Sequence, residues 1–202
     1  MSKEIVLASA SPRRVELLRN LGLSFRILPS EVDENFEAGQ PPEKVVIDLA
    51  RRKAAAVRDI LKAEDSRSRA YIIAADTIVV LDQVILGKPA DEADARLMLS
   101  RLSGRAHQVY TGVCLLWPEG EEAQAEVSDV VFRPLDTAEI DCYVATGEPM
   151  DKAGAYAVQG IGAFLVERIE GGITNIVGLP VVKTMQMLRA AGLHVMDGTA
   201  TL

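Results

Sequence analysis

The chain has 202 residues, of which 49% are hydrophobic and 25% are charged, and its formal net charge is −7. This length can bury the core of one domain, or of one domain built as two lobes. The acidic balance argues against a general nucleic-acid-binding protein, which would carry a basic face, so any affinity for phosphate must come from a local cluster of Lys and Arg.

The first predicted elements are a buried strand over 5–8 and a helix that begins after Ser11. Ser11 suits the N-cap position, and Pro12 suits the first helical position, where a missing N–H costs nothing. A strand that leads into a helix N-terminus presents unpaired backbone N–H groups, which attract anions. Arg13 and Arg14 oppose the helix dipole there, so we interpret them as holding an anion, although two solvated surface arginines would fit the same residues.

An acidic loop over 30–34 follows a short strand predicted at 25–29. Its carboxylates repel one another unless a cation lies nearby, and the alternative is a solvated acidic loop. The next helix is predicted from 41 to about 63, with Lys53 in the middle of its apolar stripe. A lysine on a buried face is costly unless it is paired or reaches a polar cleft, so we predict that Lys53 contacts an internal anion; a snorkelling structural lysine is the alternative.

The most apolar stretch, residues 71–81, reads as a core strand that Asp76 and Thr77 interrupt. A carboxylate inside a core strand needs a partner, a metal or a raised pKa. Asp76 is therefore our first candidate for a catalytic or metal-binding residue, against a buried structural aspartate. A hairpin into a strand over 84–86 would bring Lys88 close to Asp76.

The second half of the chain alternates further helices and strands. We predict helices from Asp91 to about 102, from a capping box at 136–139, and from 178 to about 191, with strands over 107–117, 126–132 and 163–169. Gly160 and Gly162 allow close backbone approach to a ligand, but they form no dinucleotide-binding fingerprint because the third glycine is absent. We predict a single domain over 1–195 and a frayed tail over 196–202.

Six charged residues have no evident structural role in the predicted fold. They come from different elements, most of them at strand ends or in the helix beside one: Arg13, Arg14, Glu34, Lys53, Asp76 and Lys88. Ligands of α/β proteins bind at such edges. Four cations with two carboxylates suit a polyphosphate and a divalent metal. Zinc chemistry is disfavoured because His107 and His194 lack ligand spacing, and no P-loop is present.

Localisation is predicted from cysteine usage and hydropathy. Cys114 and Cys142 lie far apart and form neither a metal-type spacing nor a disulfide framework, which favours a reducing compartment. The sequence shows no basic-then-apolar leader and no apolar run of membrane-spanning length. We therefore expect a cytoplasmic protein.

Short motifs extend over nearly the whole chain: SASPRR at 9–14, VDE at 32–34, ARRKA at 50–54, AADT at 74–77, GKP at 87–89, SG at 103–104, TG at 111–112, DKAGAY at 151–156, QG at 159–160 and VGLP at 177–180. In this order and spacing the chain resembles the Maf family, whose members hydrolyse nucleoside triphosphates to the monophosphate and pyrophosphate. The resemblance implies an α/β fold with a mixed, twisted sheet flanked by helices. It also implies two lobes with a central cleft, similar to inosine triphosphate pyrophosphatases.

The resemblance also assigns roles to individual residues. Asp76 matches the proton acceptor of the family, and Glu34, Lys53 and Lys88 match its catalytic and metal- or phosphate-binding positions. Two further residues are expected to bind phosphate: Ser11 and Arg14. The expected cofactor is a divalent cation, Mg²⁺ or Mn²⁺, bound through Glu34 and Asp76. Whether Asp76 is general base, metal ligand or both stays open.

Three positions divide the family by substrate, and here they are Arg13, Thr77 and Gln159, as in the subgroup that acts on dTTP and UTP. The subgroup that acts on 7-methyl-GTP has a tryptophan in place of Arg13. A Gln amide offers a donor and an acceptor, which match the N3–H and a carbonyl of uracil or thymine. A hydrogen bond from Gln159 to a neighbouring loop is the structural alternative.

Two other functions fit the resemblance. One is a non-enzymatic nucleotide-binding regulator of septum formation or cell division, and the other is a house-cleaning hydrolase of modified pyrimidine nucleotides. A pure binding protein would have no need of Asp76 inside a core strand, which favours an enzyme. The expected partner is the nucleoside triphosphate substrate, without nucleic acid or membrane. The oligomeric state is left open, a homodimer included.

Overall fold

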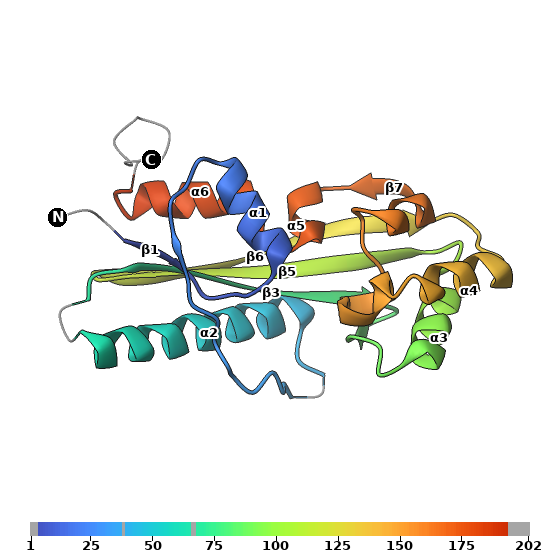
Figure 1. The fold of residues 1–202 in the computed structure, drawn as a ribbon, viewed down its shortest axis with the longest axis horizontal. Coiled ribbons are helices and arrows are strands. Elements are labelled where there is room, and N and C mark those ends of the chain that lie inside the picture. Colours follow the sequence, from blue (N-terminus) through green and yellow to red (C-terminus); the bar gives the residue numbers. More distant parts are fainter. Residues whose placement is uncertain (1–3, 38, 66–67, 194–202) are drawn as a thin grey trace. The chain divides into compact units, whose positions relative to one another are not determined.

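The computed structural model describes residues 4–37, 39–65 and 68–193, and these residues form one seven-stranded mixed sheet with helices around it (Figure 1). The spatial order of the strands is β2-β1-β3-β5-β6-β7, and β4 pairs with β3. β1 runs parallel to β2 and β3, whereas the β3–β4 and β6–β7 pairs are antiparallel. The predicted α/β fold with a mixed sheet is confirmed.

The bounds of the strands are β1 Ile5–Leu7, β2 Arg26–Ile27, β3 Tyr71–Leu81, β4 Val84–Leu86, β5 Ala106–Trp117, β6 Gly120–Phe132 and β7 Val166–Glu170. The bounds of the α-helices are α1 Pro12–Asn20, α2 Pro42–Glu64, α3 Glu92–Leu102, α4 Thr137–Ala145, α5 Ile173–Val177 and α6 Val181–Ala190. Three short 3₁₀ helices complete the described elements: η1 Glu148–Asp151, η2 Ala153–Ala155 and η3 Ile161–Leu165. No helix within the described ranges is long and apolar enough to cross a membrane.

The chain divides into two compact units. The described residues within 1–76, 111–126 and 178–202 form unit 1, and those within 77–110 and 127–177 form unit 2. The single domain over 1–195 and the central cleft stay predictions. The predicted tail, 196–202, and His194 lie outside the described residues.

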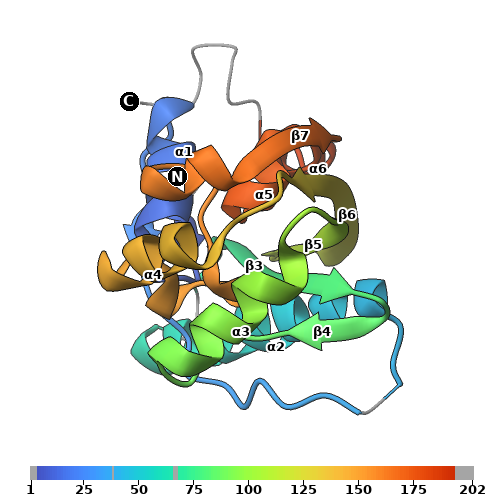
Figure 2. The same cartoon turned by 90° about the vertical axis from the view of Figure 1, so that its right-hand side faces the viewer.

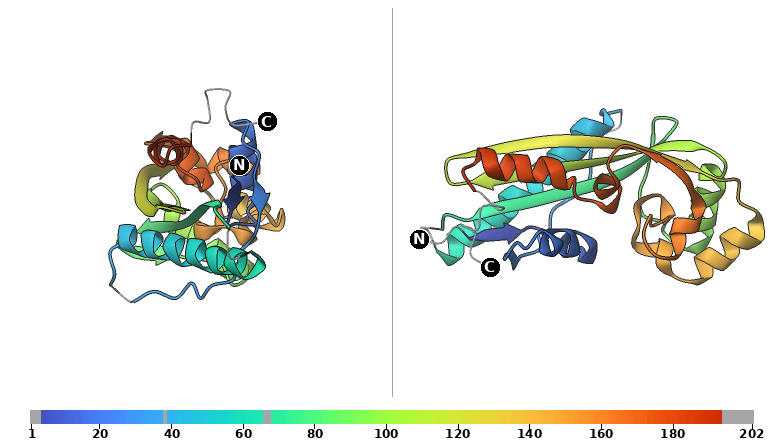
Figure 3. Two further views of the ribbon diagram at one scale, coloured as in Figure 1. Left: turned by 90° about the vertical axis from the view of Figure 1, so that its left-hand side faces the viewer. Right: turned by 90° about the horizontal axis from the view of Figure 1, so that it is seen from above.

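The core of unit 1 lies on both faces of the sheet. Leu7 packs with residues of α1 and α6, whereas its neighbour Val6 packs with residues of α2. Ile73 and Ile72 of β3 divide in the same way, because successive side chains of a strand point to opposite faces. α2 therefore covers one face and α1 and α6 cover the other (Figure 1). Figure 3 shows α6 along the β5 and β6 strands.

Helix α2 approaches the sheet closely at Gly112 of β5. A Cβ at this position would lie 2.2 Å from the backbone oxygen of Val46 in α2, which no real side chain tolerates. Only glycine fits such an approach. This contact sets the position of the helix that carries Lys53.

Unit 2 has a core of its own, in which α3 and α4 pack against each other (Figure 2). Asp91 caps α3 by accepting a hydrogen bond from the backbone N–H of Asp94 (2.9 Å). Asp136 and Glu139 form the predicted capping box of α4, with distances of 2.8 and 3.0 Å. Both predicted helix starts are confirmed, since short acidic side chains satisfy N–H groups that a helix leaves unpaired.

Two predicted strand starts are wrong, and one short helix was missed. β6 begins at Gly120 rather than near 126, because its first residues are polar and carry no apolar alternation. The strand predicted over 163–169 begins at Val166, after the 3₁₀ helix η3 over Ile161–Leu165. α5 was not predicted, because its five residues are too few for a helical pattern.

Candidate active site

A buried ion pair joins α2 to β3 in unit 1. The Nζ atom of Lys53 lies 2.5 Å from Oδ1 of Asp76, and their side chains are only 11% and 12% exposed. Nζ also lies 2.7 Å from Oε1 of Glu34, whose side chain is 58% exposed. The internal anion predicted for Lys53 is therefore Asp76 together with Glu34. The partner that Asp76 required inside its core strand is Lys53.

Arg14 is fixed beside this group by two neutral acceptors. Its Nε donates to the backbone oxygen of Gly178 (2.7 Å), and its Nη1 donates to Oγ of Ser9 (3.2 Å). Burial lowers the pKa of the Arg14 guanidinium, while the nearby Asp76 carboxylate acts in the opposite direction. The half-buried guanidinium thus has a fixed orientation and feels the charge of Asp76.

Ser11 and Arg13 lie at the start of α1, as predicted. Ser11 occupies the N-cap position, but its side chain makes no capping hydrogen bond; its backbone N–H donates to Oγ of Ser9 instead (3.2 Å). The prediction that Ser11 occupies the N-cap position of α1 is therefore confirmed, although its hydroxyl makes no capping hydrogen bond. Arg13 is half-buried, and within the described part of the chain it forms no hydrogen bond or ion pair.

Thr77, Lys88 and Gln159 belong to unit 2. The predicted β3–β4 hairpin is confirmed, and its register pairs Val79 with Leu86, two residues before Lys88. Lys88 and Gln159 are exposed, and neither side chain forms a hydrogen bond or ion pair with the residues that the structure describes. The neighbouring-loop hydrogen bond considered for Gln159 is thus not present there. The approach of Lys88 to Asp76 stays a prediction.

Two supporting residues were missed from the sequence. Ser9 orients Arg14, and Arg52 anchors the acidic loop by donating to the backbone oxygens of Asp33 (3.1 Å) and Asn35 (2.7 Å). Ser9 lies within the motif at 9–14, which was a usable signal. Arg52 likewise lies within the motif at 50–54, although that motif does not show which loop its side chain contacts.

The carboxylates of Glu34 and Asp76 are suitable ligands for a divalent cation. Both reach the same Nζ atom of Lys53, so their oxygens converge on one place. Proteins commonly bind Mg²⁺ through one or two carboxylates, with substrate phosphates and water as the other ligands. Among the described residues, no group of three or more His, Cys, Asp or Glu side chains could hold a metal by itself. Two carboxylates would leave most of the ligand positions of such a cation to water or to a bound molecule.

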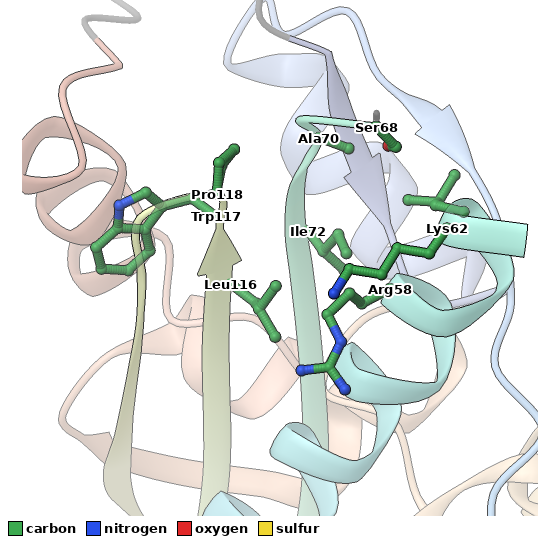
Figure 4. A pocket seen from close by; sticks show the side chains of 9 residues that line it. Arg58, Lys62, Ser68, Ala70, Ile72, Leu116, Trp117 and Pro118 are labelled. Carbon is green, nitrogen blue, oxygen red and sulfur yellow. The ribbon is translucent and has the colours of Figure 1, made fainter. Parts of the chain in front are cut away.

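A pocket near the C-terminal end of α2 is distinct from this site (Figure 4). It is lined by Arg58, Leu61, Lys62, Ser68, Ala70, Ile72, Leu116, Trp117 and Pro118. Its volume is about 90 Å³, far below the roughly 300–1,000 Å³ of small-molecule sites. No predicted site residue lines it, so we do not regard it as the substrate site.

The comparison with known families decides the relationship of this chain. The sequence profile described as Maf-like protein matches residues 4–191. The chain belongs to the Maf family. The motifs quoted from its sequence lie within the matched range.

Maf relatives with curated names match nearly the whole chain. Those from Anaeromyxobacter sp. (strain Fw109-5) and Pelotomaculum thermopropionicum are 48% and 50% identical over 197 and 196 residues, which cover 95% and 96% of this chain and 91% and 100% of the relatives. One from Halalkalibacterium halodurans is 48% identical over 191 residues, which cover 94% of this chain and 97% of the relative. All three are named dTTP/UTP pyrophosphatase. The crystal structure of protein VC0702 from Vibrio cholerae covers 73% of this chain and 79% of its own at a TM-score of 0.39 and 9% identity, a likeness too weak to support a conclusion.

Proposed function

We propose that this Maf protein hydrolyses dTTP and UTP to the nucleoside monophosphate and pyrophosphate. The observation that carries the proposal is the buried Asp76 carboxylate, held 2.5 Å from Lys53 with Glu34 beside it. The names of relatives at 44–50% identity support the substrate class. A buried charge pair is a costly arrangement that stability alone does not favour, and such pairs are frequent at catalytic sites.

In the proposed reaction, Asp76 accepts a proton from a water molecule that attacks the α-phosphorus, and pyrophosphate leaves. Lys53 keeps the carboxylate oriented before the reaction. Phosphoryl transfer depends chiefly on positioning and charge stabilisation, so cations around the phosphates contribute most of the rate enhancement. We assign this role to Lys53, Lys88 and Arg14, with the Ser11 hydroxyl as a further phosphate ligand.

The proposed cofactor is Mg²⁺ or Mn²⁺, held by Glu34 and Asp76. When bound, the cation neutralises charge on the phosphate oxygens. Lys53 lies between the two carboxylates, so it competes with the cation for them. In the absence of a cation, Lys53 compensates the charge of both carboxylates.

Base selection is assigned to Arg13, Thr77 and Gln159. A Gln amide can accept from N3–H and donate to a carbonyl of uracil or thymine, and Arg13 favours a base with two carbonyl oxygens. A site that hydrogen-bonds a base edge rejects other bases, because its polar groups would be left unpaired. Modified pyrimidines with the same edge would also be accepted.

We further propose a cytoplasmic location. The expectation that the protein can form a homodimer is to be tested by light scattering.

Replacing Asp76→Asn tests the proposal. Loss of a general base lowers the rate by about 10²–10⁴-fold, so pyrophosphate release from dTTP should fall by that factor while nucleotide binding persists. Asp59→Asn is the matched control, because it removes the same charge from an exposed position on α2. Unchanged hydrolysis by the Asp76→Asn protein would remove Asp76 from its role. A wild-type protein that binds nucleotides without hydrolysing any of a panel would support the regulator instead.

A further inference from the structure

Glu148, in η1, accepts hydrogen bonds from the backbone of the segment that follows Gln159. Its Oε1 accepts a hydrogen bond from the backbone N–H of Gly162 (2.8 Å), and its Oε2 accepts one from the N–H of Ile161 (3.0 Å). Burial alone would raise the pKa of Glu148, but the hydrogen bonds from Gly162, Tyr143 and Ile161 lower it. Both oxygens of an ionised carboxylate therefore hold this segment.

Tyr143, in α4, accepts a hydrogen bond from the backbone of the segment that precedes Gln159. Its hydroxyl accepts a hydrogen bond from the backbone N–H of Ala157 (3.1 Å) and donates to Oε1 of Glu148 (2.9 Å). Its ring also packs edge-on against Phe164, with 6.0 Å between the ring centroids. The Tyr143–Glu148 pair thus fixes the Gln159 loop, residues 157–162, at both of its ends.

The Gln159 loop has no room to shift toward the pair. A Cβ on Gly162 would lie 2.4 Å from the hydroxyl of Tyr143 and 2.4 Å from the backbone oxygen of Ala157. Gly160 has a φ of +79°, and a Cβ there would lie 2.7 Å from Oε2 of Glu148. Both glycines are required by the close contact between the loop and the pair.

The pair is itself fixed within unit 2. The backbone oxygen of Glu148 accepts from Nζ of Lys152 (3.0 Å), and its backbone N–H donates to Oγ1 of Thr146 (3.2 Å). Tyr143 is 1% exposed and belongs to a helix whose start is fixed by a capping box. A residue that recognises a substrate needs rigid support of this kind, because a displacement of about 1 Å can lower the rate about 10²-fold.

We propose that Tyr143 and Glu148 are positioning residues for Gln159 and thereby set the discrimination between nucleobases. The inference rests on the proposed function, in which Gln159 reads the base edge. Neither residue bonds the Gln159 amide, which stays exposed and unpaired within the described chain. The backbone around Gln159 is tied down while its side chain is left for a ligand.

The test compares Glu148→Gln and Tyr143→Phe with the wild type, using the ratio of kcat/KM for dTTP to kcat/KM for dCTP. A Gln at 148 keeps the shape but presents an NH₂ group to a backbone N–H, so one acceptor is lost. A Phe at 143 removes the hydroxyl that serves both Ala157 and Glu148. Each change should lower the ratio roughly tenfold to a hundredfold, because the amide of Gln159 is no longer held in register with the base.

Two control variants remove similar groups elsewhere. Glu170→Gln removes the same charge from an exposed pair with Arg168 in unit 2, and Tyr71→Phe removes a hydroxyl that bonds the oxygen of Ala191 in unit 1. Neither should change the ratio. Amide hydrogen exchange at Ile161 should accelerate in Glu148→Gln, which reports the loosened loop independently of catalysis.

A double-mutant cycle with Gln159→Ala separates positioning from general destabilisation. If the pair acts through Gln159, adding Glu148→Gln to Gln159→Ala should change the ratio no further. If both Glu148→Gln and Tyr143→Phe fold and keep the wild-type ratio of kcat/KM values, the inference is overturned. It is also overturned if the effects of Glu148→Gln and Gln159→Ala on this ratio are additive. A wild-type protein that does not prefer dTTP to dCTP would refute the proposed function first, and the inference with it.

Discussion

The Lys53–Asp76 pair leads to a quantitative prediction for the variant Lys53→Met. The substitution keeps the length of the side chain but leaves the Asp76 carboxylate, 12% exposed, without its partner at 2.5 Å. Breaking a buried pair by removing one partner costs about 3–5 kcal/mol. Glu34 is 58% exposed and regains water at little cost. Arg14 also offsets part of the loss, so we expect the lower limit, about 3 kcal/mol.

This loss should be visible as a change in thermal stability. For a chain of this size, 1 kcal/mol shifts Tm by about 2–4 °C, so Lys53→Met should lower Tm by about 6–12 °C at pH 8. Urea denaturation at pH 8 measures the same loss as a free energy of unfolding.

Two further variants control the experiment. Lys62→Met removes the same charge from an exposed position of α2 and should change Tm by about 1–2 °C at most, since surface substitutions are usually within ±0.5 kcal/mol. The double variant Lys53→Met with Asp76→Asn removes the uncompensated charge and should recover much of the stability. If the double variant is as unstable as Lys53→Met alone, the cost does not arise from a buried charge, and the reasoning fails.

Three other predictions follow from the site and from two buried groups. Removing divalent cations with EDTA should abolish dTTP hydrolysis and added Mg²⁺ should restore it; full activity in EDTA would contradict the assignment of Glu34 and Asp76 as ligands. Burial raises the pKa of the Cys114 thiol to about 12, so a thiol reagent at pH 8 should modify the exposed Cys142 in the native protein and both cysteines in urea; fast modification of two thiols in the native protein would refute this. Burial lowers the pKa of His107 to about 4, below its unfolded value near 6.5, so the free energy of unfolding should fall as the pH drops from about 6.5 to 4, and this slope should shrink in His107→Gln.

Strong burial patterns made several elements predictable. The strand over 71–81 and its hairpin were predicted at the observed bounds, because a continuous apolar run with a two-residue turn has few other solutions. The capping box of α4 was equally readable, since its partners are three residues apart. The start of β6 was not predictable, because a polar strand on a solvated face lacks the apolar alternation on which strand prediction depends.

The site was predictable as a set of residue types but not as a set of contacts. A buried carboxylate at 76 required some partner, yet the choice of Lys53 depends on how α2 packs on β3. That packing includes the close approach at Gly112, and although this glycine belongs to the motif at 111–112, the motif does not show that α2 is its neighbour. The role of Glu148 was hidden for the same reason, since its partners lie 13 and 14 residues away.

Arg52 forms its hydrogen bonds with the acidic loop through main-chain oxygens rather than through side chains. Every residue carries such an oxygen, so the two hydrogen bonds from Arg52 do not require particular side chains at 33 and 35. The Asp33 side chain has a separate part in the loop, because its Oδ1 accepts a hydrogen bond from the backbone N–H of Asn35 (2.9 Å). A homologue that lost the arginine would have to find another way to keep Glu34 within reach of Lys53.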